Sequence, residues 1–299
     1  MSSITGVSVS DQSPDPDGRA PLESDQADSG RLGDKIFGGL AKGSGILVVA
    51  LVTLIGVFLI AQAIPALSRN NANFLTSTEW NVANPDSMSF GIARLLWVTV
   101  ISSLLALILA VPLGVCIALF ITQYAPTWLA RPAASLIDLL AAVPSIVYGL
   151  WGILVLGPAL VPVNEWLVGN LGFLPFFQEP TQVANMSTGG TLLTAGIVLA
   201  VMILPIITAV TREVFMQTPK GHREAALALG ATKFEVVKVA VLPFGFSGYI
   251  SGSMLGLGRA LGETMALLLI ISTVGPMNFN LMESGETFAT KIANNAAEF

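Results

Sequence analysis

Five long apolar runs divide this chain, and they restrict the folds open to it more than any other feature. A helix needs about 20 apolar residues to cross a bilayer, and in lipid only helices and closed barrels satisfy all of their backbone polar groups. The sequence therefore predicts an all-α, polytopic membrane helical bundle. The five expected spans are 45–67, 94–122, 134–160, 191–211 and 244–274.

Composition agrees with a membrane protein and excludes several functions. The chain is 53% hydrophobic and 11% charged, whereas a soluble domain carries about 25% charged residues. Cys116 is the only cysteine, so no disulfide framework can form, and a single histidine excludes a His-based metal cluster. No basic stripe with interleaved aromatics is present, so a nucleic-acid partner is not expected.

The segments between the runs are polar. Residues 1–44 are rich in Ser, Asp, Gly and Pro and are expected to form a disordered tail, which leaves 45–299 as the transmembrane domain. Ala61-Gln62-Ala63 resembles a signal-peptide cleavage site, but the preceding tail and the apolar run are both too long for a signal peptide. Residues 161–190 are expected to form a loop. Prolines inside the runs predict kinks at Pro112, Pro144 and Pro205.

Lysine and arginine are distributed unevenly between the two sides of the membrane. Ten fall in the N-terminal tail, the second connection and the 212–243 loop, against Arg69 and Lys291 on the other side. Cytoplasmic loops carry this excess, so we expect a multi-pass protein of the cell membrane with a cytoplasmic N-terminus and a cytoplasmic 212–243 loop. The ten are Arg19, Arg31, Lys35, Lys42, Arg131, Arg212, Lys220, Arg223, Lys233 and Lys238.

The 212–243 loop carries helix start and stop signals. Thr218 and Pro219 suit the start of one helix and Gly230 its end. Thr232 and Glu235 then form a capping box for a second short helix that is expected to end before Pro243. Two such helices would make a compact knob (residues 219–242). The pattern leaves two uses open: docking in a groove of a cytoplasmic partner, or resting on the lipid headgroups.

The fifth run contains small residues and buried charge. Gly248, Gly252 and Gly256 recur every four residues, which predicts close packing against another membrane helix. Arg259 and Glu263 follow on the same helical face. A charge at mid-bilayer costs roughly 2.5–3.5 kcal/mol, so Arg259 is expected to face protein or water.

Two roles are open for this charged pair. One is a structural ion pair between Arg259 and Glu263 at i, i+4. The other is a site on a solute path, where the guanidinium forks onto an oxyanion and Glu263 holds it until the anion arrives. Thr264 and Ser253 are further candidates for lining that path, although such hydroxyls in membrane helices more often bond the backbone.

Several motifs resemble known families. Glu224-Ala225-Ala226, Gly230 and Leu242-Pro243 are similar to the EAA motif of ABC importer permeases, with Ala240 where that family usually has isoleucine. The resemblance implies that these residues dock on an ATPase subunit. The stretches 256–264 (GLGRALGET), 74–80 (FLTSTEW) and 142–149 (AVPSIVYG) resemble the phosphate-specific ABC importer permeases, closer to the PstC member than to PstA.

That second resemblance implies a function and a set of partners. The chain would be the permease subunit of a phosphate importer, with Arg259, Glu263 and Thr264 on the substrate path. It would pair with a homologous, PstA-like permease, two ATPase subunits that bind ATP and magnesium, and an extracytoplasmic phosphate-binding protein. The chain has no Gly-x-x-x-x-Gly-Lys-Ser/Thr loop, so it is not expected to hydrolyse ATP itself. The family has six spans, so we expect a sixth to be missing after residue 299.

Two other functions compete with this one. The docking motif is shared across ABC importers, so a permease for sulfate or molybdate is the alternative. An intramembrane enzyme would need a catalytic constellation, but His222 falls in the loop and Asp138 is the only other acid well inside a run. We therefore expect a transporter subunit with no catalytic or metal-binding residues.

Overall fold

The computed structural model describes residues 27–82, 88–271 and 277–295. The chain divides after Ser68 into two compact units, each described here by itself. Residues 1–26 of the expected tail, residues 272–274 of the fifth run and residues 296–299 lie outside the described residues.

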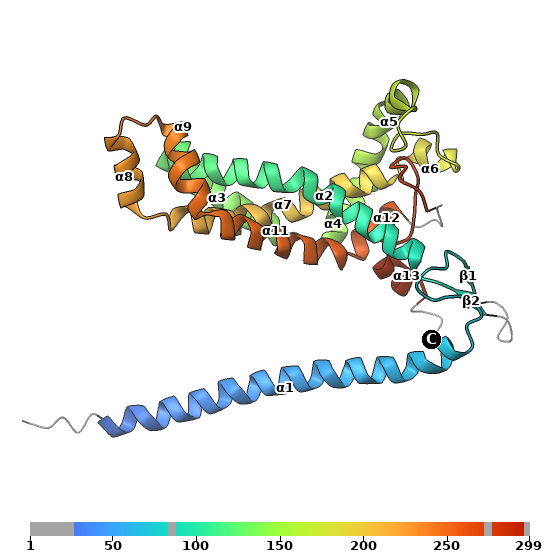
Figure 1. Ribbon diagram of the computed structural model, residues 1–299, viewed down its shortest axis with the longest axis horizontal. Coiled ribbons are helices and arrows are strands. Elements are labelled where there is room, and N and C mark those ends of the chain that lie inside the picture. The colour runs from blue at the N-terminus through green and yellow to red at the C-terminus, as the bar shows by residue number, and fades with distance from the viewer. Residues whose placement is uncertain (1–26, 83–87, 272–276, 296–299) are drawn as a thin grey trace, which may run out of the picture. The chain divides into compact units, whose positions relative to one another are not determined.

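The first unit contributes one long helix, α1 (Ala27–Ser68) (Figure 1). It begins within the stretch expected to be disordered, so the expectation for residues 27–44 was wrong. This stretch holds no proline, and Ile36, Phe37 and Leu40 continue the apolar pattern of the run that follows. A helix already formed in the apolar run extends at low cost, because propagation is far easier than nucleation.

Three helices form the core of the second unit (Figure 1). They are α2 (Ala93–Leu119), α7 (Leu192–Met216) and α11 (Phe246–Leu261), and each contacts the other two. A short π-helix, η1 (Phe120–Tyr124), extends α2. α7 is the central helix, because its apolar side chains are buried on most of its faces. The fully buried members include Val198, Leu199, Ile203 and Ile207.

Glycines allow α11 to lie close against α7. A Cβ at Gly248 would lie 2.5 Å from Cβ of Val214, and one at Gly256 would lie 3.0 Å from Cδ1 of Ile207. The first distance is too short for a Cβ and the second is unusually tight, so the backbones approach as the small-residue pattern predicted. The predicted packing of the fifth run is confirmed for its first half.

The expected third span, 134–160, is not one kinked helix. α3 (Thr127–Ala141) ends before Pro144, and a new helix starts at Ser145. Its parts are α4 (Ser145–Trp151), the π-helix η2 (Gly152–Leu156) and α5 (Gly157–Leu171). Residues 161–171, expected in a loop, are therefore helical.

The break before Pro144 has a local cause. Pro144 lacks an N–H and disfavours a helical conformation at the residue before it. The hydroxyl of Tyr148 donates a hydrogen bond of 2.8 Å to the carbonyl oxygen of Leu140, which joins the two sides of the break. The same carbonyl also accepts a hydrogen bond of 3.3 Å from the backbone N–H of Val143.

The remaining elements are short. Trp80–Asn81 (β1) pairs antiparallel with Ser89–Phe90 (β2) in a hairpin. α12 (Met265–Ile270) packs on α4 so closely that a Cβ at Gly149 would lie 2.6 Å from Cα of Ala266. The others are α6 (Val183–Thr188), α8 (Lys220–Ala228), α9 (Lys233–Val236), the π-helix η3 (Val237–Val241), α10 (Leu242–Phe244) and α13 (Phe288–Asn295).

Within the described residues, four helices are long and apolar enough to cross a membrane. They are Gly33–Ser68, Ala93–Tyr124, Ser145–Leu171 and Val183–Met216, and a fifth is counted if Lys233–Phe244 and Phe246–Leu261, bent by 63°, are one span. The predicted class, a helical membrane bundle, is confirmed.

Candidate functional site

The knob lies at one end of the three-helix core, at the opposite end from the β1–β2 hairpin (Figure 1). Its first helix, α8, begins at Lys220 and follows α7 after a short turn. The backbone at Gly230 has a φ of +82°, a conformation that favours glycine, and this residue turns the chain from α8 into α9. The stop signal predicted at Gly230 is thus confirmed.

Of the start signals predicted for the two knob helices, that of the second is confirmed and that of the first is wrong. The predicted capping box is present, with Thr232 Oγ1 accepting from the Glu235 N–H at 3.4 Å and Glu235 Oε2 accepting from the Thr232 N–H at 2.7 Å. The backbone bond from Thr232, and then its hydroxyl bond, hold the pKa of the Glu235 carboxyl below its ordinary value. Thr218 does not cap α8, because its hydroxyl is buried without a hydrogen-bond partner. Pro219, predicted as the first helical residue, is the N-cap instead.

The second knob helix does not end before Pro243, as was expected. It continues through η3 and α10 to Phe244, and the sharp bend follows at Gly245. In η3 the hydrogen bonds run one residue further than in an α-helix, and the N–H of Leu242 bonds the carbonyl of Val237. Pro243 has no N–H to donate, and the preceding π-turn places it at the first turn of α10, where a proline is tolerated.

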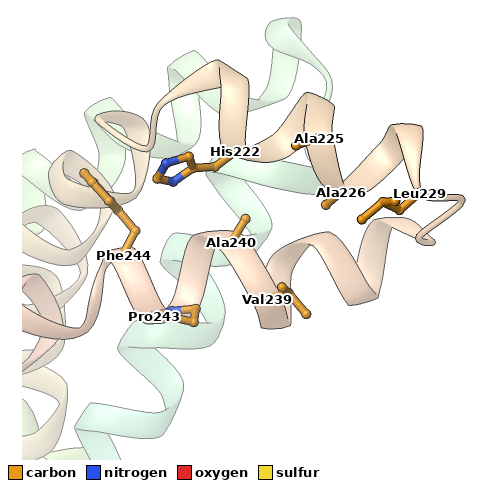
Figure 2. A pocket seen from close by; sticks show the side chains of 8 residues that line it. All are labelled: His222, Ala225, Ala226, Leu229, Val239, Ala240, Pro243 and Phe244. Carbon is orange, nitrogen blue, oxygen red and sulfur yellow. The ribbon is translucent and has the colours of Figure 1, made fainter.

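A groove opens between α8 and the segment that faces it (Figure 2). Its volume is about 480 Å³. On one side lie His222, Ala225 and Ala226 of α8 and its C-cap residue Leu229, and on the opposite side lie Val239, Ala240, Pro243 and Phe244. Small alanines on one side and an apolar opposite side leave room for an inserted apolar side chain from another protein.

The residues predicted to dock an ATPase come together only in part. Ala225, Ala226 and Pro243 line the groove. Glu224 is exposed on α8, Gly230 forms the turn, and Leu242 packs inward against Phe215 and Val241. Gly230 and Leu242 therefore shape the groove rather than line it.

Five of the eight residues that line the groove are not among the predicted docking residues: His222, Leu229, Val239, Ala240 and Phe244. His222 and Leu229 lie one helical turn before and after the two alanines, so spacing along α8 could have identified them. Val239 and Phe244 could not be found in this way, because the π-helix shifts the face that the second knob helix presents.

The predicted ion pair in the fifth run is absent. α11 ends at Leu261, so Glu263 lies in the break before α12 and not one turn above Arg259. The carboxylate of Glu263 accepts a hydrogen bond of 3.1 Å from the backbone N–H of Ala266. Glycines on both sides of Leu261, at Gly258 and Gly262, make helix continuation unfavourable there. Glu263 therefore caps α12, and the helical spacing that predicted the pair does not apply.

Within the part of the chain that the structure describes, Arg259 makes no hydrogen bond and no ion pair. Its Nε is buried without a hydrogen bond, and Glu263 does not pair with it. The neighbouring hydroxyls turn to the backbone: Ser253 Oγ donates to the Tyr249 carbonyl at 2.6 Å, and Thr264 Oγ1 to the Gly262 carbonyl at 3.4 Å. The guanidinium thus keeps donors for a ligand.

Asp138 has a structural partner. Its carboxylate lies 3.4 Å from Nη2 of Arg212, which joins α3 to the end of α7 beside the knob. Between residues 27 and 295, leaving out 83–87 and 272–276, no three His, Cys, Asp or Glu side chains gather as a metal site.

Comparison with known proteins identifies relatives over most of the chain. The family model described as "Binding-protein-dependent transport system inner membrane component" matches residues 110–296. A Mycobacterium tuberculosis protein, "Phosphate transport system permease protein PstC 2", is 52% identical over 270 residues, 90% of this chain and 83% of that protein. "Phosphate transport system permease protein PstC" of Mycobacterium leprae is 52% identical over 81% of this chain and 76% of its own length, and the protein of that name in Xylella fastidiosa (strain 9a5c) is 39% identical over 85% and 79%.

Proposed function

Because this chain belongs to the PstC permeases of the binding-protein-dependent inner membrane family, we propose that it moves inorganic phosphate into the cell as one permease subunit of an ABC importer. The observation that supports this function best is the 52% identity with the Mycobacterium tuberculosis permease, which extends over 90% of this chain. The family consists of membrane permease components and not of enzymes.

The knob is the proposed docking element for the ATPase. Its groove is apolar and exposed, and the second of its two helices starts at a capping box, which suits an inserted side chain from a partner. Glu224, Ala225, Ala226, Gly230, Leu242 and Pro243 are the docking residues of this proposal. ATP and magnesium would bind in the ATPase, whose opening and closing would move the knob and the core helices that carry it.

Arg259 is the proposed phosphate contact on the path through the membrane. A guanidinium binds a phosphate oxyanion through two parallel hydrogen bonds, and the buried Nε of Arg259 has no protein partner. Glu263 and Thr264 would line the path next to it. Glu263 acts there as the cap that fixes the start of α12 and not as a counterion.

A second permease would complete the path. The cavities described at the knob are not lined by Arg259. Next to Arg259, the side of α11 that carries Gly258, Leu261 and Gly262 is exposed, which suits close packing of another membrane helix. We therefore place the path between this chain and a homologous, PstA-like subunit, with a phosphate-binding protein delivering substrate from outside.

Uptake of labelled phosphate tests the function directly. The chain would be expressed with its partner subunits in cells whose own phosphate importers are deleted. We expect uptake that unlabelled phosphate abolishes and that sulfate and molybdate leave unchanged. If sulfate or molybdate competed as strongly as phosphate, the result would assign the path to another oxyanion. The experiment is needed because a guanidinium alone does not discriminate among these anions.

A further inference from the structure

A second cavity lies on the other side of the knob, between the knob and the end of α2. Its volume is about 150 Å³. Gln123 and Tyr124 of η1 line it from the core, and Arg223, Leu227, Lys233, Val236 and Val237 line it from the knob. The groove of Figure 2 shares none of these residues.

The polar lining of this inner cavity comes from Gln123, Tyr124, Arg223 and Lys233, and no carboxylate lines it. Arg223 is held in place because its Nη2 donates to the carbonyl oxygen of Phe215 at 3.0 Å. Its Nε is buried without a partner. Lys233 is exposed at the first turn of α9, and Tyr124 of η1 also lines the cavity.

Two positive charges in a lining that holds no carboxylate favour an anion. Lys233 is exposed, so solvent screens part of its repulsion of Arg223, and an anion bound in the cavity would be attracted to both charges. A guanidinium that is already positioned loses little entropy when it forks onto an oxyanion. The floor of the cavity is apolar and largely buried at Val236 and Val237, so the ligand is held from one side only.

We propose that the inner cavity binds a phosphate-type oxyanion that secures the knob to the end of α2. About 150 Å³ is well below the 300–1,000 Å³ of pockets for drug-sized ligands, so the group held there is a single phosphate and not a nucleotide. Two kinds of molecule present this group on the cytoplasmic side of the membrane. One is an anionic lipid, through the phosphodiester of its headgroup, and the other is free inorganic phosphate.

An anion bound at this site would regulate the knob. It would not be the substrate that the importer moves. Arg223 belongs to α8 and Lys233 to α9, so one bound anion joins both knob helices to η1. This role rests on the proposed function, in which the knob is cytoplasmic. The experiment below measures anion binding and not phosphate uptake, so a negative result in one can be told apart from a negative result in the other.

The test compares two lysine variants of the assembled importer. Lys233→Gln removes a cavity charge, and Lys238→Gln removes an exposed lysine of the same segment that does not line the cavity. Lys233 makes no ion pair within the described residues, so its substitution leaves folding intact. An unchanged unfolding temperature and unchanged recovery of the ATPase subunit verify this.

Two arms separate the sources. In the first, native mass spectrometry counts phosphatidylglycerol retained by the complex from nanodiscs that also contain phosphatidylcholine. In the second, inorganic phosphate is titrated onto the complex in phosphatidylcholine nanodiscs. We expect Lys233→Gln to weaken binding about fivefold in at least one arm, relative to Lys238→Gln. A loss in the first arm identifies a lipid, and a loss in the second identifies free phosphate. Equal binding by the two variants in both arms would overturn the proposal.

Discussion

At the scale of single residues, the break in the fifth run changes what the two charges do. A continuous helix would pair Arg259 with Glu263, and each charge would neutralise the other. Because α11 ends at Leu261, the carboxylate caps α12 through the N–H of Ala266 and the guanidinium keeps free donors. An unpaired arginine inside a membrane protein is costly, which supports a role in binding an anion.

The capping role of Glu263 gives the first prediction. Glu263→Ala removes the acceptor for the Ala266 N–H, and we expect a loss of about 1 kcal/mol in the free energy of unfolding. Glu263→Gln keeps an acceptor oxygen and should lose less. Chemical denaturation of the chain in detergent measures both. Equal stability of the Glu263→Ala variant and the unsubstituted chain would show that the cap contributes nothing.

At the scale of elements, the knob depends on its turn. Gly230 connects α8 to α9 with a φ of +82°, and Glu235 and Thr232 fix the start of the second helix. These features come from local signals, and the sequence predicted them. The bend after α10 and the π-helix before it were not predicted, because they depend on how the helix packs on Phe215 and Ala118.

A pair of glycine variants tests the turn. Gly230→Ala forces a side chain into the left-handed region at a cost of about 1–2 kcal/mol, so we expect less ATPase subunit to co-purify with the permease. Gly221→Ala is the matched control, because this glycine lies in α8 with open space around its Cβ position. Equal recovery of the ATPase with both variants would argue against docking on the knob.

Packing between α11 and α7 gives another prediction. A Cβ at Gly248 would meet Val214, so Gly248→Ala should lower the free energy of unfolding by about 1–3 kcal/mol. Gly258→Ala in the same helix meets no atom within 4 Å and should not destabilise the isolated chain. Thermal unfolding in detergent compares them. A Gly248→Ala chain as stable as the Gly258→Ala chain would contradict the packing described.

At the scale of the whole molecule, the sequence predicted the class of fold better than its breaks. Hydrophobic runs show that a segment is in the membrane but not where its helix stops, so 134–160 was read as one span although α3 ends at Ala141. Likewise, the start of α1 at Ala27 was not predicted, because the polar composition of residues 27–44 indicated a disordered tail. Local signals predicted the turn and the capping box of the knob, whereas the role of Arg259 on the path stays a prediction.

Orientation across the membrane is the prediction at this scale. The lysine and arginine bias predicts that the knob is cytoplasmic. In a Cys116→Ser background, Leu229→Cys in the knob and Phe173→Cys after α5 give two exposed single cysteines. An impermeant maleimide should label only the Phe173→Cys chain in right-side-out vesicles and only the Leu229→Cys chain in inverted ones. The reverse pattern would invert the topology and remove the knob from the ATPase.

The most direct measurement is phosphate uptake by the reconstituted importer after substitution of Arg259. Arg259→Gln removes the charge, so we expect the uptake rate to fall at least about tenfold, while the subunits still assemble. Arg131→Gln, an exposed arginine on α3, is the control and should transport normally. Uptake by the Arg259→Gln importer equal to that of the control would take Arg259 off the path and contradict the account.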